Sequence, residues 1–166
     1  MEAFREFKHL WDPDNRMNPG KLIDARQPHA DLRLGADYNP RPVNTIFRFP
    51  IDNGSLANAT LRCVGVGACR KEEGGAMCPS YRVTLDERHL TRGRANTLRL
   101  AISGQLGPDA FTSDEMAETM KLCVSCKACR RECPTGVDMA KMKIEVLAAA
   151  NKRRPRPWKD KLIAYL

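Results

Sequence analysis

The sequence has few aromatic residues and no long apolar run, which limits both its core and its relation to membranes. Only 6% of the 166 residues are aromatic and 42% are hydrophobic, so there is little material for a large apolar core. No segment approaches the roughly 20 apolar residues that a membrane-spanning helix needs. No basic-then-apolar leader precedes the cysteines, so secretion has no support. We therefore expect a cytoplasmic protein with no membrane span, held together partly by something other than apolar burial.

Cysteine, by contrast, is abundant. The chain contains seven cysteines, and in a reducing compartment such thiols are more often metal ligands than disulfide partners. An odd number also does not suit a fully paired disulfide framework. The formal net charge is +8, but metal-bound thiolates would offset much of it. We expect no nucleic-acid partner, because the sequence lacks interleaved aromatic residues for base stacking.

The first part of the chain contains little regular structure. Apolar and aromatic residues at helical spacing predict an amphipathic helix over residues 2–11, which ends at Asp12-Pro13. The chain is then rich in Pro, Asn, Asp and Gly, so we expect an extended irregular connector over residues 25–61. Alternating residues make 46–51 a candidate short strand within it.

A helix is predicted between the two cysteine segments. Thr91 can act as its N-cap, and Gly104 follows its expected last residue, Ser103. The run Arg92-Gly93-Arg94 can bring cations close to a metal site, but an exposed first helical turn explains it nearly as well. The same two interpretations, a counter-charge or a solvated basic face, apply to the basic residues among the cysteines. These are Arg70, Lys71, Lys127, Arg130 and Arg131.

Three more helices are predicted, two of them from their caps. Thr112 or Ser113 caps a helix in which methionines, Met116 and Met120, face the core. Asp138 caps a longer helix that runs to about Lys152. A last helix is expected over residues 158–166, after a Pro-rich interruption.

The second cysteine segment carries the strongest signal for a metal site. Its spacing is Cys123-x2-Cys126-x2-Cys129-x3-Cys133-Pro134, which lets one tight loop direct three thiolates at one iron–sulfur cluster. In two-cluster ferredoxins the fourth cysteine of such a run ligates the other cluster. A zinc site is the alternative, although zinc sites generally use separated Cys-x2-Cys pairs.

The first cysteine segment, Cys63-x5-Cys69-x8-Cys78-Pro79, is a degenerate partner of the second. Val66 stands where a middle cysteine would complete the run. If the Cys-Pro cysteines swap between segments, Cys78 completes a four-thiolate site and Cys133 a three-thiolate site. Val66 cannot bind a fourth iron, which favours a 3Fe-4S cluster beside a 4Fe-4S cluster. The alternative is a single 4Fe-4S cluster, with the first segment only structural. The predicted metal ligands are Cys63, Cys69, Cys78, Cys123, Cys126, Cys129 and Cys133.

Several motifs together resemble a known family. They are Arg62–Arg70, Met77–Tyr81, Thr91–Ala95 and Cys123–Gly136, with Asp12-Pro13 and Met17–Lys21 nearer the front. This set resembles the iron–sulfur part of FAD-linked oxidases of the D-2-hydroxyglutarate dehydrogenase and glycolate oxidase type. It is also similar to the succinate dehydrogenase iron–sulfur subunit, where an apolar residue at the position of Val66 accompanies a 3Fe-4S cluster.

The resemblance implies a mostly α fold: a helical ferredoxin-like module with two pseudo-symmetric cysteine loops. Residues 1–24 would end an FAD-linked catalytic half, 25–61 would be the connector, 62–152 the iron–sulfur domain, and 153–166 the truncated start of a further helical segment. It further implies electron transfer from a reduced flavin in an FAD-linked D-2-hydroxy acid dehydrogenase to a downstream acceptor.

The catalytic partner would be an FAD-binding domain in the same chain or in a partner. FAD would bind only in the full-length enzyme, and this chain would not be catalytic alone. A free-standing iron–sulfur subunit of a respiratory or glycolate-oxidising complex is one alternative, and a structural zinc module is another.

Overall fold

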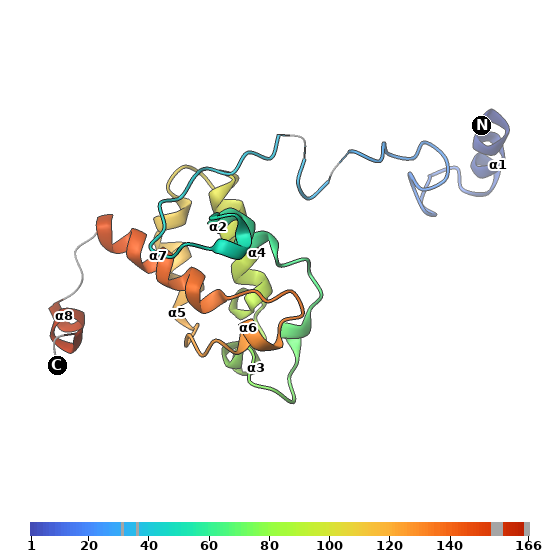
Figure 1. Cartoon of the computed structure of the whole chain (residues 1–166). Helices are drawn as coiled ribbons and strands as arrows, with labels where there is room; N and C mark the ends of the chain where they lie inside the picture. Colours follow the sequence, from blue (N-terminus) through green and yellow to red (C-terminus); the bar gives the residue numbers. More distant parts are fainter. Residues whose placement is uncertain (31, 36, 154–157, 165–166) are drawn as a thin grey trace. The chain divides into compact units, whose positions relative to one another are not determined.

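A computed structural model of the chain describes residues 1–30, 32–35, 37–153 and 158–164. The chain forms two compact units, Met1–Tyr38 and Asn39–Leu166 (Figure 1). The helix content confirms the predicted helical class, and every regular element of the described residues is an α-helix or a short 3-10 helix. None of the described helices is both long enough and apolar enough to cross a membrane.

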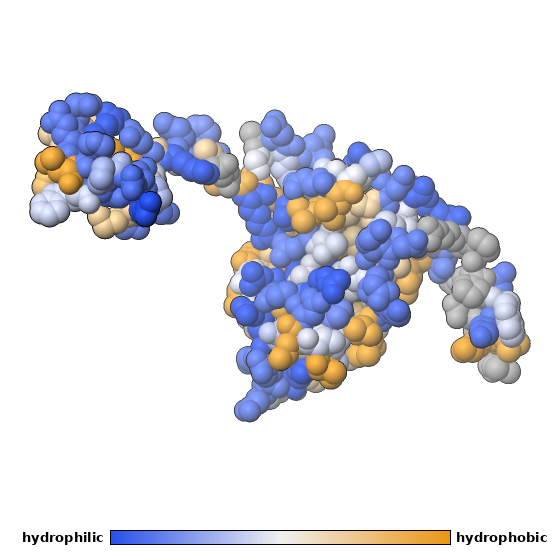
Figure 2. Space-filling model, turned by 180° about the vertical axis from the view of Figure 1, so that it is seen from behind, coloured by the Kyte–Doolittle hydropathy of each residue, from blue (hydrophilic) through white to orange (hydrophobic). Residues whose placement is uncertain are grey.

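The first unit contains helix α1, Glu2–Trp11, as predicted. Asp12 ends it, because its carboxylate accepts hydrogen bonds from the backbone N–H groups of Arg16 and Met17, both at 2.8 Å. The Lys8 ammonium also pairs with this carboxylate and holds its pKa below the usual range. The aromatic side chains of α1 are exposed, and apolar patches lie among hydrophilic surface in Figure 2.

The second unit is a helical domain built around one central helix. Its elements are η1 Pro50–Asp52, α2 Leu56–Leu61, η2 Ala68–Arg70, α3 Pro79–Thr84, η3 Glu87–His89, α4 Thr91–Ile102, η4 Ala110–Thr112, α5 Asp114–Lys121, α6 Ala128–Glu132, α7 Met139–Arg153 and α8 Trp158–Ala164. Helix α4 packs against α2, α5 and α7, so it forms the centre of the core. Leu90, Leu98 and Ile102 are almost fully buried there.

Methionines fill much of the remaining core. Met116 and Met120 on α5 are buried against α7, which contributes Met139 and Met142. This confirms the prediction that the α5 methionines are core residues. Flexible thioether side chains suit a core with few aromatic residues, because they fill irregular gaps.

Most predicted helix ends are confirmed. Ser113 caps α5 by accepting from Met116 N–H, and Asp138 precedes α7 and accepts from Lys141 N–H at 3.0 Å. Gly104 follows α4 with a φ of +83°, the left-handed conformation in which glycine ends helices. The predicted Thr91 cap is wrong: Leu90 is the N-cap residue and Thr91 is the first helical residue.

The predicted strand over residues 46–51 is also wrong. The backbone N–H groups of Ile46 and Phe47 donate to the buried Glu145 carboxylate on α7, at 2.8 and 2.7 Å. These donors are therefore not available to a neighbouring strand. Residues 39–61 belong to the second unit.

The last predicted helix corresponds to α8. The Pro-rich interruption at 154–157 and the final two residues lie outside the described residues.

Candidate metal centre

The two cysteine loops have matching backbone geometry. In the first loop, Gly65 and Gly67 have φ angles of +86° and +84°. In the second loop, Ser125 and Lys127 have φ angles of +56° and +61°. Each left-handed pair flanks one residue, which is Val66 in the first loop. Loops with left-handed residues form concave backbone sites, a geometry that also occurs around iron–sulfur clusters.

Cys126 occupies the position equivalent to Val66, as the cysteine spacing of the two segments predicts. Both side chains are exposed. Each loop leads into a helical turn, η2 or α6, that begins with alanine and cysteine. The two loops therefore present their cysteines on equivalent backbones, and differ in whether the middle residue is a thiol.

A first cavity, which we call the four-cysteine cavity, joins residues from both segments. Cys123, Cys126 and Cys129 line it from the second segment, and Cys78 lines it from the first. Its other lining residues are Pro79, Ser80, Thr91, Arg94, Val124, Ser125, Lys127, Met139 and Ala140.

A second cavity, which we call the three-cysteine cavity, contains the complementary set of cysteines. Cys63 and Cys69 line it from the first segment, and Cys133 lines it from the second. Val66 lines it as well, at the position without a thiol. Thr91 borders both cavities, so the two lie next to each other.

Backbone N–H groups at two helix N-termini point at cysteine sulfurs. Thr91 at the start of α4 donates its N–H to Cys78 Sγ at 3.1 Å, and its hydroxyl lies 3.1 Å from the same sulfur. Arg92 N–H bonds Cys69 in the same way, and Met139 at the start of α7 donates to Cys129 Sγ at 3.4 Å. First-turn N–H groups have no partner within their own helix, and their partial positive charge favours thiolates.

These contacts and burial have opposing effects on the thiols. Burial raises the pKa of Cys69 and of Cys129, although backbone N–H groups act against it. Burial also acts to raise the pKa of Cys133, but hydrogen bonds from Thr135 and from the backbone of Val137 and Gly136 outweigh it and lower that pKa. These three thiols are therefore partly buried groups with nearby hydrogen-bond donors, which is the environment that bound thiolates require.

One contact holds the two cysteine segments together, and another packs α4 closely on η3. Glu132 on α6 accepts from the backbone N–H groups of Ala76 at 2.8 Å and Met77 at 3.0 Å, which ties the second segment to the approach to Cys78. Gly93 lets the first turn of α4 pack closely on η3, because an added Cβ would lie 2.0 Å from the Glu87 carbonyl oxygen. No other residue fits that approach without a shift of the backbone.

The described cysteine side chains are not gathered around one point. Within the described ranges, no three His, Cys, Asp or Glu side chains lie close enough together to hold a single metal ion. The thiols instead surround two cavities, with four around one and three around the other. Thiolates are the usual ligands of iron–sulfur clusters, which are larger than a single ion and need such a cavity.

All seven cysteines lie within residues 59–137, which match the family model described as a 4Fe-4S dicluster domain. These residues are therefore similar to 4Fe-4S dicluster domains. The predicted resemblance is thereby confirmed, and an electron-transfer role through iron–sulfur clusters follows for this domain.

Comparison with known proteins extends the similarity beyond the dicluster domain. The chain is 26% identical to "D-2-hydroxyglutarate dehydrogenase" of Haemophilus influenzae over 98% of its own length, and to the protein of the same name from Escherichia coli over 96%. It is 29% identical to "Probable glycolate oxidase iron-sulfur subunit" of Bacillus subtilis over 58% of its length. The chain spans only 19% of each of these relatives. No solved structure matches it.

Sequence reasoning left the role of the basic residues near the cysteines undecided. Arg94, in the predicted first turn of α4, is 2% exposed and lines the four-cysteine cavity. The alternative of an exposed first turn is therefore wrong for Arg94. The pattern of the helix contains the signal, because Arg94 lies four residues before Leu98 and after Leu90, on the buried face.

Proposed function

We propose that the four-cysteine cavity binds a 4Fe-4S cluster through Cys78, Cys123, Cys126 and Cys129. The three-cysteine cavity would bind a 3Fe-4S cluster through Cys63, Cys69 and Cys133. One observation carries this proposal: each cavity combines cysteines of one segment with the Cys-Pro cysteine of the other. The apolar Val66 beside the second cavity supports three irons there rather than four.

In the proposed role, the chain carries electrons from a reduced flavin in an FAD-linked D-2-hydroxy acid dehydrogenase to a downstream acceptor. The names of the similar dehydrogenases and the resemblance of the front segment support this assignment. Iron–sulfur clusters supply one-electron carriers, whose potentials depend on charge, hydrogen bonds and exposure. The residues of this chain hold two such sites on either side of Thr91 and surround their sulfurs with N–H donors.

The FAD-binding domain would lie in the same chain or in a partner, and the compartment would be the reducing cytoplasm. A second candidate, a free-standing iron–sulfur subunit, is favoured by the similarity to the Bacillus subtilis protein. The two candidates share the same cluster sites, so the test of those sites serves both.

The test uses the two Cys-Pro cysteines as matched controls for each other. The chain is purified anaerobically as the wild type, Cys78→Ser and Cys133→Ser, and its iron, sulfide and zinc are measured. Electron paramagnetic resonance then follows the oxidised three-iron signal and the reduced four-iron signal. We expect Cys78→Ser to lose the four-iron signal and keep the three-iron signal, and Cys133→Ser to do the reverse.

Two results would contradict the proposal. The reverse pattern of losses would show that each segment ligates its own cluster. A colourless wild-type protein with stoichiometric zinc and no sulfide would rule out the clusters themselves. Circular dichroism of both variants distinguishes loss of one site from loss of the fold, because metal binding and folding are coupled in small metal domains.

A further inference from the structure

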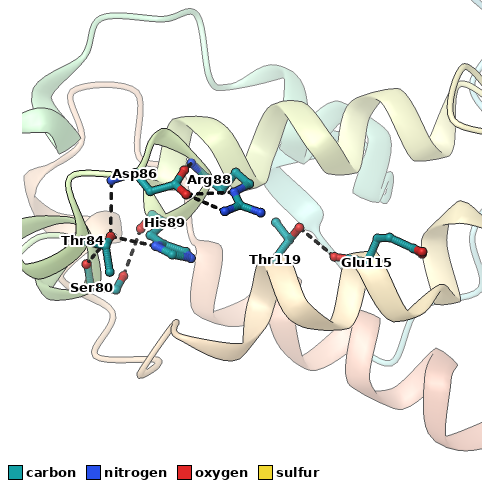
Figure 3. A network of polar contacts seen from close by, with 7 residues as sticks. All are labelled: Ser80, Thr84, Asp86, Arg88, His89, Glu115 and Thr119. Carbon is teal, nitrogen blue, oxygen red and sulfur yellow. Dashed lines mark hydrogen bonds and ion pairs between the residues drawn. The ribbon is translucent and has the colours of Figure 1, made fainter.

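Arg94 is a buried cation held from three sides. Its Nε donates to the Thr119 carbonyl oxygen at 2.9 Å, its Nη1 to the His89 carbonyl oxygen at 2.6 Å, and its Nη2 to Ser80 Oγ at 3.2 Å. These acceptors come from α5, η3 and α3. Figure 3 shows Ser80 beside His89, and Thr119 on the neighbouring helix. The guanidinium is therefore fixed in position.

All three acceptors are uncharged, and no carboxylate among the described residues pairs with Arg94. The charged groups that act on it are the cysteines of the four-cysteine cavity, Cys123, Cys78 and Cys129, if they are thiolates. A buried cation without a counter-charge is costly. Such a cost is offset when an anionic group occupies the cavity that the cation lines.

The two cavities differ in their arginines. Arg94 lines the four-cysteine cavity, whereas Arg92 lines the three-cysteine cavity and is partly exposed. Residues two positions apart point to nearly opposite sides of a helix. Helix α4 thus directs one arginine toward each cavity, and only the buried one acts through a medium that screens its charge weakly.

We propose that Arg94 is the positioning residue that supplies the counter-charge of the four-cysteine cavity and raises the reduction potential of the cluster there. Reduction adds one negative charge to a cluster, and a fixed buried cation stabilises that charge. Uncharged hydrogen-bond donors surround the sulfurs in both cavities, so these donors do not distinguish the potential of one site from that of the other. The inference rests on the proposed cluster sites.

The test is a redox titration of anaerobically purified chain, followed by electron paramagnetic resonance, for Arg94→Gln and Arg94→Lys. Gln removes the charge and keeps a donor, whereas Lys keeps the charge. We expect Arg94→Gln to lower the equilibrium constant for reduction at the four-iron site about ten-fold or more, a shift of about 59 mV for one electron. Arg94→Lys should keep most of the wild-type potential.

The molecule offers two controls. The three-iron site in the same protein should shift much less than the four-iron site. Arg99→Gln removes another arginine that is buried in α4 but lines neither cavity, and it should leave the potential of the four-iron site close to that of the wild type.

Each outcome decides the inference. Full iron content with an unchanged four-iron potential in Arg94→Gln would overturn it and leave Arg94 a structural role only. If Arg94→Gln does not retain the four-iron cluster, retention by Arg94→Lys supports the inference, and loss in both variants overturns it. A wild type that contains zinc and no sulfide would instead refute the proposed function, so the two failures are distinguishable.

Discussion

Replacing Gly93 with alanine tests how tightly the first turn of α4 must pack to form the centre. The added Cβ would lie 2.0 Å from the Glu87 carbonyl oxygen and 3.0 Å from its carbonyl carbon. Ordinary contact begins near 3.4 Å, so α4 and η3 would have to separate by more than 1 Å. Both neighbours are backbone atoms, which cannot rotate away as a side chain can. The shift would also move His89, whose carbonyl oxygen accepts from Arg94.

Two effects of this substitution compete. Alanine favours a helix over glycine by up to about 1 kcal/mol, whereas inserting a methyl group into a packed contact costs about 1–3 kcal/mol. The clash here is with backbone, so we expect the upper part of that range and a net loss of about 1–2 kcal/mol. Gly35→Ala is the matched control, since no atom lies within 4 Å of its added Cβ.

The measurement is the free energy of unfolding in denaturant, under anaerobic conditions, followed by far-ultraviolet circular dichroism. A Gly93→Ala variant more stable than the wild type would refute the reasoning, because helix propensity alone would then account for the change. We also expect this variant to lose iron faster than the wild type, while Gly35→Ala loses it at the wild-type rate.

Two further predictions concern other parts of the domain. Val66→Cys should raise the iron content from about seven to about eight atoms per chain and replace the three-iron signal with a second four-iron cluster; a wild type with four irons and no three-iron signal would contradict this. Glu145→Gln should lower the free energy of unfolding by about 2 kcal/mol, because a buried charged acceptor of two backbone N–H groups is lost. The exposed Glu118→Gln is the control for Glu145→Gln, with little expected change, and equal stability of both variants would show that the Glu145 carboxylate does not hold residues 46–47.

Local signals in the sequence predicted much of the fold. The caps Ser113 and Asp138, the terminating Gly104 and the buried methionines of α5 all act within one or two helical turns. Such signals are readable because the residues that interact are close in sequence. The cysteine spacing belongs to the same class, since one short loop brings its thiols together.

The two incorrect predictions concern residues whose partners are distant in sequence. The candidate strand at 46–51 did not form, because its N–H groups bond Glu145, which lies 99 residues after Ile46. Thr91 is not a cap, because its N–H and hydroxyl contact the sulfur of Cys78, 13 residues earlier. In both cases a tertiary partner competed successfully with the local pattern.

The sequence by itself determined the helical class, the type of centre and the thiols available to it, because composition and spacing fix which donors exist and how far one loop can reach. Only the tertiary structure decided how the thiols divide between two cavities and which arginine is buried beside one of them. That division depends on α3, α4 and α6 meeting around Thr91. Such a meeting is set by the packing of the whole domain, which no short stretch of sequence specifies.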